Sequence, residues 1–483
     1  MNYSYSNYIG KRTWLVAAVG LALAGCASLP PKDATPQLAA PERADFAQVK
    51  TAPRNGGDWP AANWWRQFGD AQLDTLIDHA LANSPSMAVA QARVTQATAA
   101  TRAVVANGGI DLAANGQVSR QLYSRNSVYP PPLAGSWDTS GLLQLDFSYD
   151  FDFWGRNRSA IEAALGERAA AQAEVAAASA SLSAAVAHSY FQWQALNAHI
   201  ALIDHIENER SALVKLESSR VKAGIVAGDN LHPLVADAAA PQQTRIQLQT
   251  QRDQLLYQLQ SLVGGERNMP ALKPVPLPAV NAALPSDLPM DLLARRPDIA
   301  AARDRVQASL KQVDSARAAF YPDISITAFA GANSLYMGKL LHAGSRELGI
   351  TPALHLPLFD AGRLRAALDE NRADVTLAVA QYDQALQGAV ADVNDAIVRL
   401  DGAEAERASL DRQQEARQRD LAGASQRLKA GLVDRREVLR NQLSLIGVQD
   451  QEINRHAQAL AAQVDLIKAL GGGYGAPGDT AQP

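Results

Sequence analysis

The 483-residue chain contains a single cysteine, Cys26. A lone cysteine excludes any internal disulfide, so the fold is not held together by a disulfide framework. The N-terminal apolar run at residues 14–23 is too short to cross a bilayer as a helix. A basic excess is also missing, since the net charge is −4. That balance argues against a nucleic-acid-binding protein, which needs cations to neutralise phosphates.

The motifs of common enzyme active sites are missing as well. None of the eight histidines forms the His-Glu-x-x-His pattern of zinc proteases. The chain has no Gly-x-Ser-x-Gly elbow and no Gly-x-x-x-x-Gly-Lys phosphate loop. The glycines at 471–475 follow an expected helix and do not open one, unlike a dinucleotide-binding loop. We therefore expect no catalytic residues, no metal site and no enzymatic activity.

The N-terminus is typical of an exported lipoprotein. Lys11 and Arg12 precede the apolar run, which ends in Leu-Ala-Gly-Cys at 23–26 and resembles a bacterial lipobox. This pattern predicts a signal peptide over 1–25 and a covalent lipid, a diacylglycerol plus an N-acyl chain, on Cys26. The alternative is an incidental or buried cysteine. Because Ala27 and not aspartate follows, we expect the lipid-anchored segment 26–70 to lie at the outer membrane.

Residues 143–153 alternate strictly between apolar and polar side chains. The odd positions are leucine, phenylalanine or tyrosine, and the even positions carry glutamine, serine or aspartate. A period of two over eleven residues is the pattern of a strand with two unlike faces. We expect the apolar face to contact lipid, and we expect four polar residues to face water inside a channel: Gln144, Asp146, Asp150 and Asp152.

The junction after this strand recurs later in the chain. Gly-Arg-Asn-Arg at 155–158 matches Gly-Arg-Leu-Arg at 362–365, and Gly224 and Gly431 are also 207 residues apart. This constant offset predicts an internal duplication. The expected organisation is repeat 1 at 71–265 with a hairpin at 111–153, a Pro-rich linker at 266–289, repeat 2 at 290–470 with a hairpin at 323–359, and a tail at 471–483.

Each hairpin is followed by a very long helical stretch. Residues 156–222 and 363–429 hold no strong breaker, and the first is rich in alanine. A helix of that length is about 100 Å long, which indicates a coiled coil or a helical barrel. Gly224 and Gly431 suit the position just after a helix end. Asp229 or Asn230 can cap the helix that follows the first of them.

The expected strands are long enough for tilted transmembrane strands. Four strands cannot close a barrel, and open edges cannot face lipid, so other copies of the chain must complete it. We therefore expect a mixed fold of long α-helices and transmembrane β-strands. Two alternatives are an amphipathic hairpin packed on a soluble core, and a structural outer-membrane lipoprotein with a coiled-coil stalk and no transport role.

Several further motifs occur in a characteristic order: Trp-Trp-Arg-Gln-Phe-Gly-Asp at 64–70, Leu-Leu-Ala-Arg-Arg-Pro-Asp-Ile at 292–299 and Phe-Tyr-Pro-Asp-Ile at 320–324. With the lipobox and both Gly-Arg junctions, they resemble the TolC/OprM family of outer-membrane efflux factors, and more narrowly its NodT-type lipoprotein branch. The resemblance covers nearly all of the chain after Cys26. It implies a homotrimer in which a twelve-stranded barrel, four strands per chain, continues into a periplasmic helical tunnel.

The same resemblance implies the function and the partners. The family provides the exit duct of tripartite efflux systems, here for small toxic compounds or drugs. Such a duct works with a periplasmic membrane-fusion adaptor and an inner-membrane pump. The turns between helices would contact the adaptor, and the candidate contact residues are Gly224, Ala227, Gly431 and Val433.

Related ducts close their periplasmic end with an aspartate on the helix after the second turn. Counting from Gly431, that position is Arg440 in this chain. Arg436, Glu437 and Arg440 are therefore the candidate gate residues, and three inward Arg440 side chains would favour anionic cargo. The alternative is that Arg436 and Arg440 lie on an outward, solvated face, with Glu437 pairing between neighbouring helices.

Overall fold

A computed structural model describes residues 34, 38, 57–281 and 295–475. The predicted signal peptide, Cys26 and the start of the Leu-Leu-Ala-Arg motif lie outside these residues. The chain divides into two compact units. The sheet unit contains Thr95–Ala169 and Arg303–Gln381, and the helical unit contains the remaining described segments from residue 57 onward. Each unit therefore takes segments from both halves of the chain.

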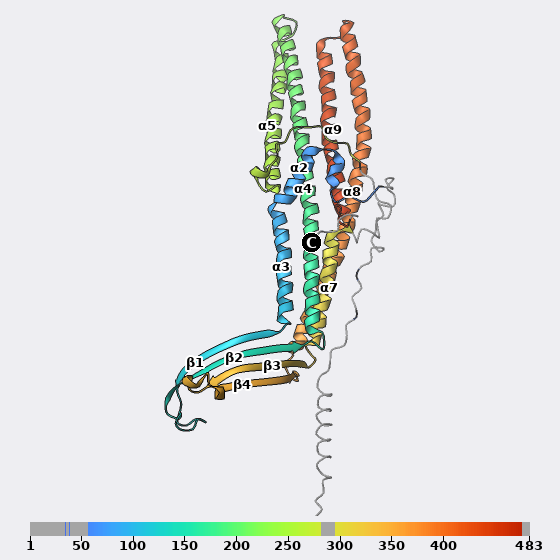
Figure 1. Cartoon of the computed structure of the whole chain (residues 1–483). Helices are drawn as coiled ribbons and strands as arrows, with labels where there is room; N and C mark the ends of the chain where they lie inside the picture. Colours follow the sequence, from blue (N-terminus) through green and yellow to red (C-terminus); the bar gives the residue numbers. More distant parts are fainter. Residues whose placement is uncertain (1–33, 35–37, 39–56, 282–294, 476–483) are drawn as a thin grey trace, which may run out of the picture. The chain divides into compact units, whose positions relative to one another are not determined.

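The sheet unit is built around one antiparallel sheet of four strands in the order β1-β2-β3-β4 (Figure 1). The strands are β1 Asp111–Leu122, β2 Trp137–Phe151, β3 Asp323–Ser334 and β4 Arg346–His355. Both predicted strand pairs are confirmed. β4 is shorter than expected and ends before Pro357, which has no N–H to offer a neighbouring strand. Pro352 stays within β4, where an edge strand tolerates it.

Asp152 differs from its predicted place, because β2 ends at Phe151. The Asp152 carboxylate accepts hydrogen bonds from the backbone N–H groups of Asn157 (3.1 Å) and Arg158 (2.8 Å). These donors belong to the first turn of the next helix and have no partner within it. The prediction of Asp152 as a strand residue facing the channel is therefore wrong: the side chain caps a helix.

The two long helices are confirmed and are equal in length. Helix α4 spans Arg156–Lys222 and helix α8 spans Arg363–Lys429, each with 67 residues. The others are α2 Ala71–Asn83, α3 Pro85–Asn107, α5 Leu231–Leu262, α7 Pro297–Ala318 and α9 Arg435–Ala469. Ser84, which precedes Pro85, separates α2 from α3. None of the helices in the described ranges combines the length and apolar composition needed to span a membrane.

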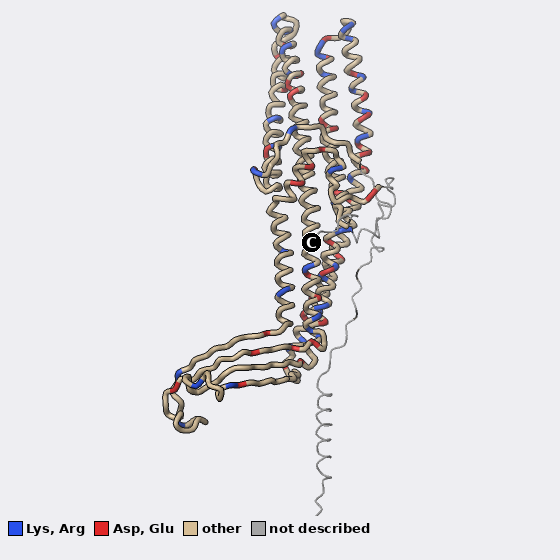
Figure 2. The backbone as a smooth tube through the Cα atoms, viewed as in Figure 1, with Lys and Arg blue, Asp and Glu red and all other residues tan. Residues whose placement is uncertain are grey.

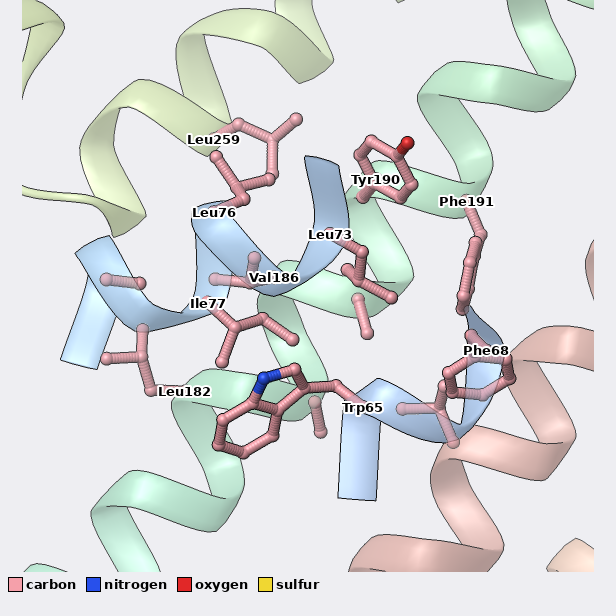
Figure 3. Close-up of a cluster of buried hydrophobic side chains, with 14 of the residues drawn as sticks. Trp65, Phe68, Leu73, Leu76, Ile77, Leu182, Val186, Tyr190, Phe191 and Leu259 are labelled. Carbon is pink, nitrogen blue, oxygen red and sulfur yellow. The ribbon is translucent and has the colours of Figure 1, made fainter. Parts of the chain in front are cut away.

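The core of the helical unit forms around α2 (Figure 3). Leu73 shares one helix face with Leu76 and Ile77, three and four residues further on, and all three are fully buried. They pack with side chains of the short helix η3, Trp64–Phe68, and of α4, α5 and α9. Asp70 caps α2 and also accepts a hydrogen bond from the hydroxyl of Tyr190 (2.6 Å). Burial and this carboxylate raise the pKa of Tyr190.

Three glutamines hold the described part of the Pro-rich linker against the helical unit. Gln72 accepts from the backbone N–H of Lys273 (2.7 Å), and Gln194 accepts from that of Val275 (2.9 Å). Gln463 accepts from the N–H of Asn281 (3.1 Å) and donates to its carbonyl (2.7 Å). The glutamines come from α2, α4 and α9 and replace the backbone partners that an extended segment otherwise lacks.

Arg296 connects three helices of the helical unit. Its guanidinium is largely buried and donates to Asp298 at the start of α7 (2.7 Å) and to Asp392 on α8 (3.1 Å). It also donates to the carbonyl of Ala469, the last residue of α9 (3.1 Å). Burial by itself would raise the pKa of Asp298, but hydrogen bonds and charge from Arg296 outweigh it and lower that pKa. The Arg-Pro-Asp segment therefore has a structural role: it connects the start of α7 to α8 and to the end of α9.

We expect Arg296→Met to destabilise the protein by about 1.5–2 kcal/mol, because it removes the hydrogen bonds to two half-exposed carboxylates and to the Ala469 carbonyl. Urea unfolding followed by circular dichroism measures this loss. The matched control is Arg419→Met, since Arg419 and its partner Glu415 are 76% and 62% exposed. That control should change stability by less than about 0.5 kcal/mol. Equal effects of the two substitutions would contradict the role of Arg296.

Candidate functional site: channel wall and helical tips

The register of the sheet sorts its side chains into two unlike faces. Directly paired residues of antiparallel strands project to the same side. One row across all four strands is Leu112, Phe147, Ala328 and Ile350. A row on the opposite side is Asn115, Gln144, Gly331 and Glu347. The alternation expected for β2 alone thus extends over the whole sheet.

The apolar face is continuous over the four strands. Leu143, Leu145, Phe147, Tyr149 and Phe151 lie on it and pair with alanine, isoleucine and leucine of neighbouring strands. Leu348 is 77% exposed and Leu112 is 68% exposed in the single chain. Such a broad exposed apolar face is unusual for a soluble monomer and indicates a surface that something else covers.

The polar face carries every acidic residue of the four strands: Asp111, Asp138, Asp146, Asp150, Asp323 and Glu347. The structure therefore brings Gln144, Asp146 and Asp150 together, whereas Asp152 is absent from this set. Asp146 accepts hydrogen bonds from the side-chain amides of Asn115 (2.7 Å) and Gln144. This face has the composition of a water-filled channel wall.

The edges of the sheet are open within the described chain. β1 pairs only with β2, and β4 pairs only with β3, among the strands that the structure describes. Each edge consequently presents unpaired backbone N–H and C=O groups. Unpaired groups of this kind are tolerated in water but not in a hydrocarbon environment.

The two helical tips end in the same backbone motif. Gly224 has φ +69° and Gly431 has φ +71°, the left-handed conformation that glycine adopts without strain. After Gly224, Ile225 N–H donates to the Arg220 carbonyl (3.0 Å), and after Gly431, Leu432 N–H donates to the Arg427 carbonyl (2.9 Å). Both bonds satisfy carbonyls at a helix end. The predicted helix-ending glycines are confirmed.

The helix starts after the two tips differ from each other. Neither Asp229 nor Asn230 caps α5 as predicted: both lie in a short 3-10 turn, and Asn230 makes no side-chain cap bond. After the second tip, Asp434 caps α9 by accepting from the Arg436 N–H (3.0 Å). The position equivalent to Asp434 in the first repeat is Ala227, which has no capping side chain.

Charged contacts join α4 to α9 next to the tips. Arg436 donates to Asp434 (2.7 Å) and lies 3.5 Å from Glu217 of α4. Glu217 is only 4% exposed, and Arg220 beside it lies 3.5 Å from Asp434. The Arg436 hydrogen bond holds the pKa of Asp434 below its ordinary value. The stability that the Arg436–Asp434 hydrogen bond contributes is therefore fully present when the pH is above the ordinary pKa of aspartate. It is lost as the pH falls through the lowered pKa of Asp434.

The three candidate gate residues have different surroundings. Glu437 pairs with Arg427 of α8, and Arg436 belongs to the contact with α4. Arg440 is exposed and has no ion pair among the residues that the structure describes. Sequence reasoning missed Glu217 and Arg220, whose spacing of three residues in the last turns of α4 was the available signal.

Comparisons with known proteins decide the family. The family model described as "Outer membrane efflux protein" matches residues 76–265 and 288–472. The chain belongs to this family. It is 34% identical over 461 residues to the multidrug resistance outer membrane protein MdtP of Escherichia coli K12, covering 94% of each chain.

Solved structures of efflux channels resemble the chain over most of its length. The outer membrane protein VceC of Vibrio cholerae is 33% identical, with a TM-score of 0.78 and coverage of 86% of this chain and 100% of VceC. The outer-membrane channel OprN is 25% identical, with a TM-score of 0.81 and coverage of 92% and 98%. This member of the efflux family is thus an outer-membrane channel component and not an enzyme. No group of side chains suited to a metal ion is found in the described part of the chain.

We expect Arg436→Ala to loosen the tips, because it removes the cation shared by Glu217 and Asp434. Hydrogen–deuterium exchange of the amides at 217–232 and 427–440 should become faster, by up to about tenfold for each 1.4 kcal/mol lost. The matched control is Arg440→Ala, which removes no ion pair of the described chain and should leave these rates unchanged. Equal acceleration in both variants would show that the Arg436 contacts do not hold the tips.

Proposed function

We propose that three copies of this chain form a closed barrel of twelve strands, with four strands from each copy. The open edges of β1 and β4 support this assembly, because pairing β4 of one copy with β1 of the next removes every edge. The long helices of the three copies would then surround a tunnel through the periplasm. The predicted repeats at 71–265 and 290–470 are the units that supply one hairpin and one long helix each.

The sheet with two unlike faces is the observation that carries this proposal. Its apolar face would contact outer-membrane lipid, and its polar face, with Gln144, Asp146 and Asp150, would line the water-filled lumen. The duct would release small toxic compounds or drugs from a multicomponent efflux system. A structural stalk, the alternative function, requires no carboxylates gathered on one face of a sheet.

The anchor and the partners belong to the same proposal. Cys26 would carry lipid after removal of residues 1–25, and Cys26→Ser should abolish labelling of the protein by a radioactive fatty acid. Residues 26–70 would then begin at the membrane surface, and 266–289 would act as the linker between repeats.

The tips would meet a periplasmic membrane-fusion adaptor that connects the duct to an inner-membrane pump.

The gate is proposed to lie at the tips. Arg436 and Glu437 have partners within the chain, on α4 and α8, and would hold the helices in the closed arrangement. Arg440 has no such partner among the residues that the structure describes and is the residue available to line the opening. Three like charges repel by roughly 1 kcal/mol per pair in a watery opening, which biases ion selectivity without locking the gate.

The central test compares substitutions on the two faces of β2. A cation on the lipid face near the midplane costs about 2–4 kcal/mol, so Phe147→Arg should reduce the yield of assembled trimer strongly. Asp146→Arg, one residue away on the polar face, should assemble and conduct ions in planar bilayers. Its preference for cations should fall below that of wild type. Absence of conductance in the wild-type protein, or equal assembly of both variants, would refute the channel wall.

Cysteine crosslinking in cells tests the adaptor contact. The native chain, whose single cysteine is Cys26, serves as the control, so that crosslinks can be assigned to the introduced cysteine. Cysteines introduced at Ala227 or Val433 should capture the adaptor, because these residues belong to the turns beyond Gly224 and Gly431. The neighbouring apolar side chains Ile225 and Leu432 are 65% and 75% exposed, which leaves the turns free for a partner. Capture only from cysteines placed in the β1–β2 or β3–β4 loops would rule out this docking site.

A further inference from the structure

The strands contain two cationic residues, and both lie on the apolar face. Arg120 of β1 pairs with Thr139, and Arg346 of β4 pairs with Ala332. Both partners lie on the face that carries the leucines and phenylalanines of β2. The six carboxylates of the strands all lie on the opposite face. The two signs of charge are therefore separated by the sheet itself.

Both arginines lie at the end of the sheet away from the helices of the sheet unit. Arg120 is close to the C-terminus of β1, and Arg346 is the first residue of β4. Figure 2 shows basic residues gathered at this end of the strands. Trp137, on the same face and 62% exposed, accompanies them.

The length of the apolar face places these arginines at a membrane boundary. On β2 it runs from Gly141 to Phe151, which is about 33 Å along the strand. With the usual tilt of barrel strands this corresponds to an apolar band about 25 Å tall. Arg120 pairs with Thr139, one row beyond Gly141 and just outside that band, whereas Arg346 shares the row of Ala332 and Leu143, one row inside the end of the band. A cation costs little so close to the end of the band, and Trp137, one row beyond Arg120, is a residue typical of the interface.

Neither guanidinium has a carboxylate partner in the described chain. Both side chains are exposed, and Arg346 Nε donates a hydrogen bond to the Ala343 carbonyl (3.0 Å). The residues paired directly with them, Thr139 and Ala332, carry no charge. An arginine whose stem lies along an apolar surface extends its head to the polar boundary, where it can bind phosphate through two parallel hydrogen bonds.

We propose that Arg120 and Arg346 bind the phosphate groups of an acylated glycolipid of the outer leaflet, of the lipid A type. The inference rests on the barrel proposed above, because only that barrel turns the apolar face toward lipid. β1 and β4 are the two edges of the sheet, so closure of the barrel makes them adjoining strands of neighbouring copies. Each site would thus take Arg346 from one copy and Arg120 from the next. Val118 and Leu348, on the same face and on the band side of the two arginines, would contact the acyl chains.

Native mass spectrometry of the full-length protein in detergent tests the site. The probe is bis-phosphorylated lipid A, compared with its dephosphorylated form, with phosphatidylglycerol and with inorganic phosphate. Wild type should retain lipid A, whereas the double variant Arg120→Gln/Arg346→Gln should bind it about tenfold more weakly or worse. Arg120→Lys/Arg346→Lys keeps the charge and should bind at an intermediate level. Arg125→Gln, which removes an arginine after the end of β1, should behave as wild type.

Three results would overturn the site: the double Gln variant binds lipid A as wild type does, dephosphorylated lipid A binds equally well, or inorganic phosphate displaces the lipid. Equal, arginine-dependent binding of phosphatidylglycerol would overturn the assignment to lipid A. Measuring the conductance of the same preparations distinguishes a failure of the lipid site from a failure of the proposed channel function. Wild-type channels that conduct but retain no lipid A overturn the site alone, whereas a wild-type chain that never conducts overturns the barrel and the site with it.

Discussion

The open edges of the four-stranded sheet are the constraint on which the rest of the structure depends. In hydrocarbon, every backbone N–H and C=O needs a partner within the protein, because no water is present to provide one. β1 and β4 each leave one edge without a partner in the described chain. A single chain with this sheet is consequently incomplete in a membrane. In the barrel proposed above, the chains would therefore have to assemble before or during insertion into the membrane.

The junctions between the sheet and the two long helices are built in the same way in both halves of the chain. Asp152 caps the start of α4, and Asp360 accepts from the backbone N–H groups of Gly362 (3.0 Å) and Leu364 (2.8 Å) at the start of α8. Gly155 and Gly362 have positive φ and make the turn between strand and helix. A carboxylate near a helix N-terminus is also favourable for the helix dipole. In both repeats, therefore, a glycine makes the turn from strand to helix and an aspartate caps the first turn of the helix.

The sequence was most informative where one pattern extends over many residues. The alternation at 143–153 and the offset of Gly224 and Gly431 predict the strands, the long helices and their ends. Asp152 was misjudged because a helix cap that follows an alternating strand continues the same polar–apolar pattern. The contact of Glu217 with Arg436 needs the rotation of two helices, which residue spacing does not provide. The face of Arg120 depends on cross-strand register, since β1 alternates only weakly.

The alternation of lipid and water contacts along β2 is the central claim, and site-directed spin labelling measures it most directly. Labels placed one at a time at positions 143–149 of the protein in lipid vesicles report collisions with oxygen, which dissolves in lipid, and with a water-soluble nickel chelate. The odd positions should favour oxygen and the even positions the chelate, with a strict period of two. Equal access of the chelate to Leu145, Phe147 and Asp146 would contradict the channel wall.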